Sequence, residues 1–108
     1  MAAAQIDAKL LQEIEDYVKI NKVMIFSKSR CPYCHTVKEL LKSLGVDYFA
    51  LELDTTEGGS QLQRAMGKKV GRTSVPQVFI NEEHIGGCDD TLAAHESGKL
   101  QTLLKAVA

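Results

Sequence analysis

The sequence predicts an α/β domain in which helices flank a central, mixed, four-stranded sheet. Three observations support this fold class. Apolar residues recur at helical spacing in several segments, short apolar runs alternate with those segments, and two late runs are separated by a tight polar turn. The 108 residues suit one domain spanning 1–108, and no linker, repeat or low-complexity segment interrupts the sequence.

The first half of the chain predicts two helices and two strands. A helix is expected over residues 6 to about 20 and a buried strand over Lys22–Ser27. A second helix should follow Cys31 and end near Gly45, before a strand over Tyr48–Leu53. The first helix should bury an apolar face formed by Ile6, Leu10, Leu11, Ile14, Tyr17 and Val18.

The second half predicts a weaker helix and a hairpin. Gly58-Gly59-Ser60 should precede a helix over residues 61 to about 68. Gln77–Ile80 and His84–Ile85 have the pattern of two strands joined by a tight turn at Asn81–Glu83. Since helices separate the first strands, we expect parallel crossovers there, with the hairpin adding an antiparallel edge.

A last helical region should follow the hairpin. Asp89, Asp90 and Thr91 are good N-cap candidates for it, because their side chains can accept hydrogen bonds from the free N–H groups of a first helical turn. Gly98 lies within this region and should interrupt it.

Composition and charge argue against several function classes. Hydrophobic residues make up 44% and charged residues 25%, and the formal charge of −1 gives no reason to expect a nucleic-acid partner. No apolar run approaches the ~20 residues that span a bilayer, so no membrane partner is expected. Residues 1–5 lack the features of a signal peptide, so we expect a cytoplasmic protein. In a reducing compartment a Cys pair is more often catalytic or metal-binding than structural.

The most informative motif is Cys31-Pro32-Tyr33-Cys34, which lies between a predicted strand and a predicted helix. Only a thiolate attacks a disulfide, and the positive end of a helix dipole favours the thiolate form of Cys31. Pro32 suits the first helical turn, where its missing N–H costs nothing. Cys34 lies further into the helix and should stay protonated until it resolves a mixed disulfide at Cys31. Cys31 and Cys34 are therefore the predicted catalytic residues.

Three other interpretations of this pair are open. The two cysteines could simply be small buried residues. Cys31-Pro32-Tyr33-Cys34-His35 also matches the pattern of c-type haem attachment, which normally needs export and a second axial ligand. Structural zinc needs about four ligands, and the candidates left are Cys88, His84 and His95, none at paired spacing. We therefore expect no metal. The three cysteines are an odd number, so at least one lies outside any internal disulfide.

Four motifs in order resemble those of a dithiol glutaredoxin, a family with the thioredoxin fold. They are Lys28 three residues before Cys31, the Cys31-Pro32-Tyr33-Cys34 centre, Ser74-Val75-Pro76, and Gly86-Gly87-Cys88-Asp89-Asp90. The resemblance covers nearly the whole chain. Thioredoxin itself fits less well, because its usual Trp-Cys-Gly-Pro-Cys motif is absent and the chain has no Trp.

The resemblance implies a glutathione-dependent thiol–disulfide oxidoreductase. Cys31 would attack a glutathionylated substrate or another mixed disulfide, and free glutathione or Cys34 would then complete the exchange. Glutathione would be the reducing co-substrate, regenerated through glutathione reductase, with glutathionylated or disulfide-containing proteins as partners of a monomer. The alternative is a dimer that bridges an iron–sulfur cluster through Cys31 and two glutathiones, which Pro32 disfavours by stiffening the loop.

The resemblance also implies contacts to the glycyl and cysteinyl parts of glutathione. Lys28 and Gln63 would hold the glycine carboxylate, and Tyr33 would pack beside the sulfur. A cis peptide bond before Pro76 would turn the Val75 backbone toward the ligand, as in a short added strand. Solvated positions for Lys28 and Gln63, and a Pro76 that merely begins a strand, are the competing interpretations.

The γ-glutamyl end of glutathione would lie at the start of the helix after Gly87. The backbone N–H groups of Cys88 and Asp89 would bind its carboxylate, and the Asp89 side chain would bind its ammonium. Plain helix capping is the competing role for Asp89 and Asp90. Cys88 is either a passive small residue or a further redox-active thiol, and the passive role is favoured.

The chain departs from the usual family pattern just before Val75. Ser74 stands where the family usually has Thr and keeps the hydroxyl, so it stays a predicted contact. Thr73 stands where the family usually has Arg, with Arg72 one place earlier, so the anion contact of that arginine is open. His35 and His84 are expected to be surface residues.

Overall fold

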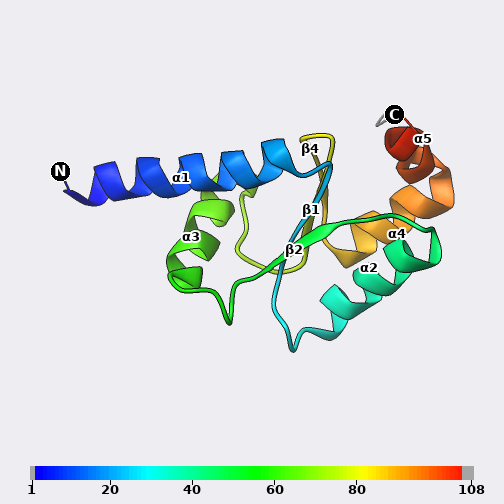
Figure 1. The fold of residues 1–108 in the computed structure, drawn as a ribbon, viewed down its shortest axis with the longest axis horizontal. Coiled ribbons are helices and arrows are strands. Elements are labelled where there is room, and N and C mark those ends of the chain that lie inside the picture. Colours follow the sequence, from blue (N-terminus) through cyan, green and yellow to red (C-terminus); the bar gives the residue numbers. More distant parts are fainter. Residues whose placement is uncertain (1, 106–108) are drawn as a thin grey trace.

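A computed structural model describes residues 2–105, with the backbone alone for residues 2–7. Its elements are α1 (Ala2–Ile20), β1 (Val23–Ser27), α2 (Pro32–Ser43), β2 (Phe49–Glu52), α3 (Gly59–Val70), β3 (Gln77–Ile80), β4 (Glu83–Gly86), α4 (Cys88–Ser97) and α5 (Lys99–Lys105). The predicted alternation is present, with one sheet between two groups of helices (Figure 1). Among residues 2–105, no helix combines the length and apolar character needed to cross a membrane.

The four strands form a mixed sheet in the order β2-β1-β3-β4. β1 pairs parallel with β2 and antiparallel with β3, and β3 pairs antiparallel with β4. The parallel crossover through α2 is therefore confirmed, but the connection through α3 leads to an antiparallel strand. The hairpin also contributes more than an edge, because β3 lies inside the sheet beside β1.

Apolar side chains cover both faces of the sheet. Alternate residues of β1 point to opposite faces, so Met24 and Phe26 join the core under α1 and α3. Val23 and Ile25 join the core under α2, α4 and α5 (Figure 1). This explains why β1 is a continuous apolar run. The ring of Phe26 packs edge-to-face on Phe79 of β3, with centroids 5.8 Å apart, and ties the two central strands together.

The predicted apolar face of α1 lies against the first of these cores. Ile14 and Val18 are buried, at 0% and 2% exposure. Leu10, Leu11 and Tyr17 pack partly buried beside them, whereas the side chain of Ile6 lies outside the described residues. The helical spacing therefore identified the packed face correctly wherever the structure describes it.

Several element boundaries differ from the predicted ones by one to four residues, and two of these differences have a clear structural cause. The hairpin turn consists of Asn81 and Glu82, both with positive φ (52° and 69°), and β4 already begins at Glu83. A two-residue turn of this kind matches the twist of the strands that it joins. The N-cap of α4 is Gly87, so the predicted caps Asp89, Asp90 and Thr91 lie inside the first turn. The carboxylate of Asp90, inside the first turn, accepts a hydrogen bond from the backbone N–H of Gly87. The prediction assumed instead that the capping side chain belongs to the N-cap residue itself.

Gly59, the first residue of α3, packs directly on the backbone of Leu53. A Cβ at Gly59 would overlap the Leu53 carbonyl oxygen, whereas a Cβ at Gly58 would meet no atom and would only strain a left-handed backbone. We expect Gly59→Ala to lower the free energy of unfolding by about 3 kcal/mol and Gly58→Ala by about 1 kcal/mol. Urea denaturation measures both, and equal losses would mean that α3 moves away from Leu53 at little cost.

Candidate active site

Cys31 is the N-cap residue of α2, directly after the loop that leaves β1. Its backbone is extended (φ −88°, ψ 116°), and Pro32 fills the first helical position. The Cys34 backbone N–H donates to Cys31 Sγ at 3.4 Å. The sulfur thus takes the place of the side-chain oxygen in an ordinary N-cap. Both this N–H group and the helix dipole stabilise a negative charge on the sulfur.

Cys34 has the opposite environment. Its side chain is fully buried, at 0% exposure, whereas Cys31 is half-buried. Burial raises the pKa of the Cys34 thiol from 9.0 to about 11, because a thiolate loses its hydration there. Hydrogen bonds from the Lys28 backbone and the Ser27 side chain lower this pKa without cancelling the effect. At neutral pH Cys34 is therefore a protonated thiol beside an accessible partner.

Two side chains hold the loop that precedes Cys31. The N–H and hydroxyl groups of Ser29 donate to the two carboxylate oxygens of Asp54, at 2.9 and 2.6 Å. These bonds hold the pKa of Asp54 below its ordinary value. His35 Nε2 lies 2.8 Å from the Ser29 carbonyl oxygen and donates to it, since a carbonyl only accepts. Ser29 and Asp54 were not among the predicted site residues, because no local pattern signals a contact between residues 25 positions apart.

The segment before β3 faces Cys31. The Val75–Pro76 peptide bond is cis, as the resemblance implies. Cys31 Sγ lies 3.8 Å from the Val75 carbonyl oxygen, to which the thiol donates. β1 and β3 are neighbours, with Phe26 opposite Gln77. The segments that follow β1 and precede β3 therefore meet at the same edge of the sheet.

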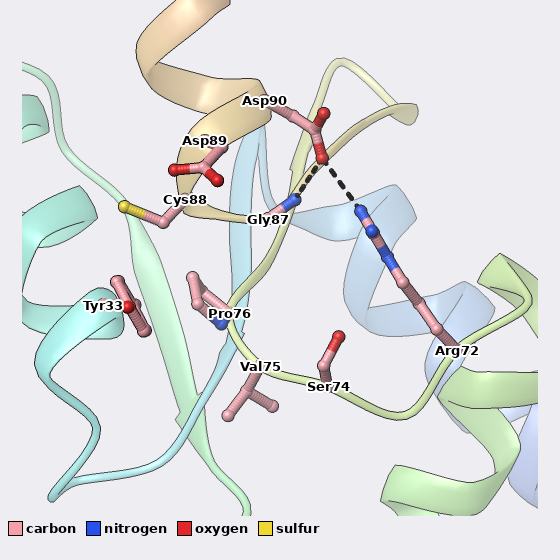
Figure 2. A pocket seen from close by; sticks show the side chains of 9 residues that line it. All are labelled: Tyr33, Arg72, Ser74, Val75, Pro76, Gly87, Cys88, Asp89 and Asp90. Carbon is pink, nitrogen blue, oxygen red and sulfur yellow. Dashed lines mark hydrogen bonds and ion pairs between the residues drawn. The ribbon is translucent and has the colours of Figure 1, made fainter.

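A cavity of about 180 Å³ opens between this segment and the start of α4 (Figure 2). It is lined by Tyr33, Arg72, Ser74, Val75, Pro76, Gly87, Cys88, Asp89 and Asp90. Every predicted glutathione contact except Lys28 and Gln63 is in this set. The fold thus brings together three separate parts of the chain: the start of α2, the segment before β3 and the start of α4.

An ion pair forms one wall of the cavity. Arg72 Nη2 donates to Asp90 Oδ2 at 2.9 Å, and the same oxygen accepts the Gly87 N–H at 3.0 Å (Figure 2). Both contacts hold the pKa of Asp90 below its ordinary value, the Gly87 N–H most strongly. Asp90 is therefore the capping aspartate, and the Asp89 carboxylate stays at the cavity. Gly86 leaves the space for this arrangement, since a Cβ there would overlap the Asp90 carboxylate.

Arg72 lines the cavity although the sequence analysis assigned it no contact. The usual family position for this arginine holds Thr73, yet the cation still reaches the wall beside Ser74. The sequence signal that could have identified Arg72 was its position two residues before Ser74, in a segment already predicted to bind glutathione. Its partner Asp90 is 18 positions away, and only the fold brings the two side chains together.

Lys28 and Gln63 lie near the site but not in the cavity lining. The Lys28 carbonyl oxygen accepts the Cys31 N–H at 3.2 Å, and its side-chain charge acts on Asp54. Gln63 Nε2, on α3, donates to the Thr73 carbonyl oxygen at 2.7 Å. Gln63 therefore steadies the segment that leads to Ser74 and Val75.

Cys88 lines the cavity but is a poor nucleophile. It is 8% exposed, and burial, followed by the charge of Asp89, raises the pKa of its thiol. A thiol that stays protonated attacks disulfides slowly, so this environment favours the passive interpretation. Across the side chains that the structure describes, residues 8–105, no three of His, Cys, Asp or Glu come together as potential metal ligands.

An accessible thiol at a helix N-terminus, a buried thiol three residues later and a facing cis-proline segment are the parts of a thiol–disulfide redox site. A family model described as Glutaredoxin matches residues 23–85, more than half of the chain. A Ricinus communis glutaredoxin is 47% identical over 94 residues, which are 87% of this chain and 92% of the relative. Glutaredoxin-C2 of Arabidopsis thaliana is 48% identical over 94 residues, with 87% and 85% covered.

The structural comparison agrees. The crystal structure of a buckwheat glutaredoxin–glutathione complex superposes with a TM-score of 0.91 at 38% identity, covering 94% of this chain and 93% of that one. The chain therefore belongs to the glutaredoxin family of thiol oxidoreductases, and its fold is the thioredoxin fold. The expectation from the four motifs is confirmed in both respects.

The buried Cys34 thiol predicts a loss of stability at alkaline pH. Its pKa is 9.0 ordinarily and about 11 in the folded chain, so the native state keeps a proton that the unfolded state releases. This contribution is complete below pH 9 and is lost as the pH rises to 11. Over that range the free energy of unfolding of the wild type should fall about 3 kcal/mol further than that of Cys34→Ser. Urea denaturation of the reduced proteins measures this, and parallel pH curves would contradict it.

Proposed function

We propose that this protein is a glutathione-dependent thiol–disulfide oxidoreductase that works through Cys31 and Cys34. One observation carries the proposal: Cys31 Sγ accepts the Cys34 N–H at 3.4 Å and lies 3.8 Å from the Val75 carbonyl oxygen, beside a charged cavity. The buckwheat glutaredoxin of the same fold was crystallised in complex with glutathione. That complex supports the same ligand for this chain.

The first route needs Cys31 and reduces glutathione mixed disulfides. The Cys31 thiolate attacks the glutathione sulfur, a Cys31–glutathione disulfide forms, and the substrate sulfur leaves as a thiolate that takes up a proton. A second glutathione thiolate then attacks the glutathione sulfur held on Cys31. Oxidised glutathione leaves and the Cys31 thiolate is restored, so one mixed disulfide is reduced for each glutathione consumed.

The second route needs both cysteines and reduces internal protein disulfides. Cys31 attacks one substrate sulfur, and the other leaves as a thiolate. Because the pKa of Cys34 is about 11, its thiol must lose a proton before it attacks the Cys31 sulfur. The departing substrate thiolate is the nearest base for that proton. The reduced substrate is released and the Cys31–Cys34 disulfide is then reduced by two glutathiones.

The charges of glutathione match the walls of the cavity. The first N–H groups of α4, at Cys88 and Asp89, have no acceptor within the helix and suit the γ-glutamyl carboxylate. The Asp89 carboxylate suits the neighbouring ammonium, and Arg72 adds a cation at the same wall. The glycine carboxylate would extend out of the cavity toward Lys28 and Gln63.

The iron–sulfur alternative gains no support from the arrangement of the site. Pro32 occupies the first position of α2 directly after Cys31, and a proline there has a fixed φ and stiffens the loop. Thiol–disulfide exchange needs only the approach of a sulfur to Cys31, which this loop permits. We therefore propose the redox function alone.

The two routes predict different losses in two serine variants. Turnover of a small glutathione mixed disulfide, coupled to glutathione reductase, should vanish in Cys31→Ser and persist in Cys34→Ser. Reduction of an internal disulfide such as that of insulin should vanish in Cys31→Ser and fall on the order of 100-fold in Cys34→Ser. Equal losses of both activities in Cys34→Ser would refute the division of roles, and an inactive wild type would refute the proposed function.

Substituting alanine for each of the two neighbouring aspartates should have different effects, one on KM and the other on stability. Asp89→Ala should raise the KM for a glutathione mixed disulfide about tenfold, because the ligand ammonium loses its carboxylate. Asp90→Ala removes the cap on Gly87 and should lower the free energy of unfolding by about 1 kcal/mol. Steady-state kinetics and urea denaturation of both variants make the comparison, and a KM effect confined to Asp90→Ala would reverse the assignment.

A further inference from the structure

Gln77 links the sheet to the segment that faces Cys31. Its side chain is completely buried at the start of β3. The amide nitrogen donates to the Ser74 carbonyl oxygen at 3.0 Å and lies 3.4 Å from Ser74 Oγ. The amide oxygen lies 2.7 Å from His84 Nε2 on β4. A chain of hydrogen bonds therefore runs from β4 through β3 to the wall of the cavity.

The chemistry of the partners fixes the direction of every bond in this chain. The Ser74 carbonyl can only accept, so the nitrogen of the Gln77 amide faces Ser74 and its oxygen faces His84. That oxygen can only accept, so His84 presents an Nε2–H group. Partial loss of hydration where the ring packs, followed by the charge of Arg72, lowers the pKa of His84 and so favours the neutral ring. It rests tilted on Phe79, with ring centroids 4.9 Å apart.

His84 lies beside a β-bulge in β4 and on the same face of the sheet as Gln77. Phe79 pairs with His84, but Val78 pairs two residues further along β4, so Ile85 is the extra residue. Bulges increase the local twist and redirect side chains. Gln77 and Phe79 are two residues apart on one face of β3. The His84 ring, which packs on Phe79, is therefore able to contact the Gln77 amide.

We propose that Gln77 is a positioning residue: held by His84, it fixes the Ser74 carbonyl and so the Val75 backbone that faces Cys31. A buried amide is costly unless its groups are hydrogen-bonded, and these contacts satisfy both ends of it. The inference rests on the proposed function, because the Val75 backbone is the group that would pair with glutathione. Gln77 thereby sets how tightly the ligand is held without touching the reacting sulfur.

The direct test is Gln77→Leu, which keeps the side-chain volume similar and removes both amide contacts. The KM for a glutathione mixed disulfide should rise about fivefold while kcat stays within about twofold of the wild type. The rate at which iodoacetamide alkylates Cys31 should change less than about twofold, because the N–H donor of α2 is untouched and only the longer contact of the sulfur with the Val75 carbonyl oxygen is affected. A fall in kcat with an unchanged KM would overturn the proposal.

Two variants separate positioning from a general loss of stability. Val78→Ala is the matched control, since Val78 is equally buried on the same strand but packs on the opposite face. It should lower the unfolding midpoint and leave KM unchanged, and a KM rise equal to that of Gln77→Leu would overturn the proposal. His84→Phe keeps the ring on Phe79, removes the N–H donor at an exposed position, and should raise KM about twofold to threefold.

A double variant and a measurement without substrate complete the test. Adding His84→Phe to Gln77→Leu should raise KM no further, because the ring acts through the amide, and additive effects would count against this. NMR order parameters of the Ser74 and Val75 amides should fall from about 0.85 in His84→Phe and Gln77→Leu, but not in Val78→Ala. This readout needs no turnover, so an inactive wild type with falling order parameters would refute the proposed function alone. Unchanged order parameters and KM in an active enzyme would refute the positioning role.

Discussion

The antiparallel pairing of β1 with β3 is the constraint on which the rest of the site depends. Because Phe26 lies opposite Gln77, the end of β1 and the beginning of β3 lie at one edge of the sheet. The loop to Cys31 and the Val75–Pro76 segment are therefore neighbours before any side chain is considered. The pairing is stabilised from both faces by buried apolar residues of β1, and the contact of Cys31 Sγ with the Val75 carbonyl oxygen follows from it.

The two thiols of one helical turn differ because they lie at different depths. Cys31 replaces the capping oxygen of α2, where an N–H group and the helix dipole meet its sulfur. Cys34 lies in the first turn with its side chain in the core, where burial raises its pKa to about 11. One helix start thus gives two thiols of opposite character: an accessible one whose sulfur accepts an N–H group, and a buried one that keeps its proton at neutral pH. Two neighbouring residues also have different environments at the start of α4, where Asp90 accepts the Gly87 N–H and the Asp89 side chain lines the cavity.

Sequence reasoning predicted whatever depends on local spacing and missed what depends on strand pairing. The Cys pair, the apolar runs and the helical periodicity placed the elements within a few residues, and the motifs identified most of the cavity lining. The predicted parallel direction of β3 was wrong, because a helix between β2 and β3 does not determine which strand β3 pairs with, and β3 pairs antiparallel with β1. Arg72, Asp54 and Gln77 were missed for the same reason, since each acts through a partner brought near by tertiary structure. The start of α4 was predicted too late in the sequence, because the N-cap is Gly87 and the carboxylate that binds its N–H belongs to Asp90, three residues later.

Polar residues, most of them outside the predicted set, support the two sides of the site, namely the loop before Cys31 and the segment before β3. Asp54 holds the loop before Cys31 through two bonds to Ser29, and nothing in that contact reaches the cavity wall. Gln63 and Gln77 hold the opposite segment, through the carbonyl groups of Thr73 and Ser74. The loop to Cys31 and the facing segment before β3 are therefore supported by separate sets of polar side chains. Under the proposed function, we expect substitutions in the first set to change mainly the reactivity of the Cys31 thiol and substitutions in the second set to change mainly the affinity for glutathione.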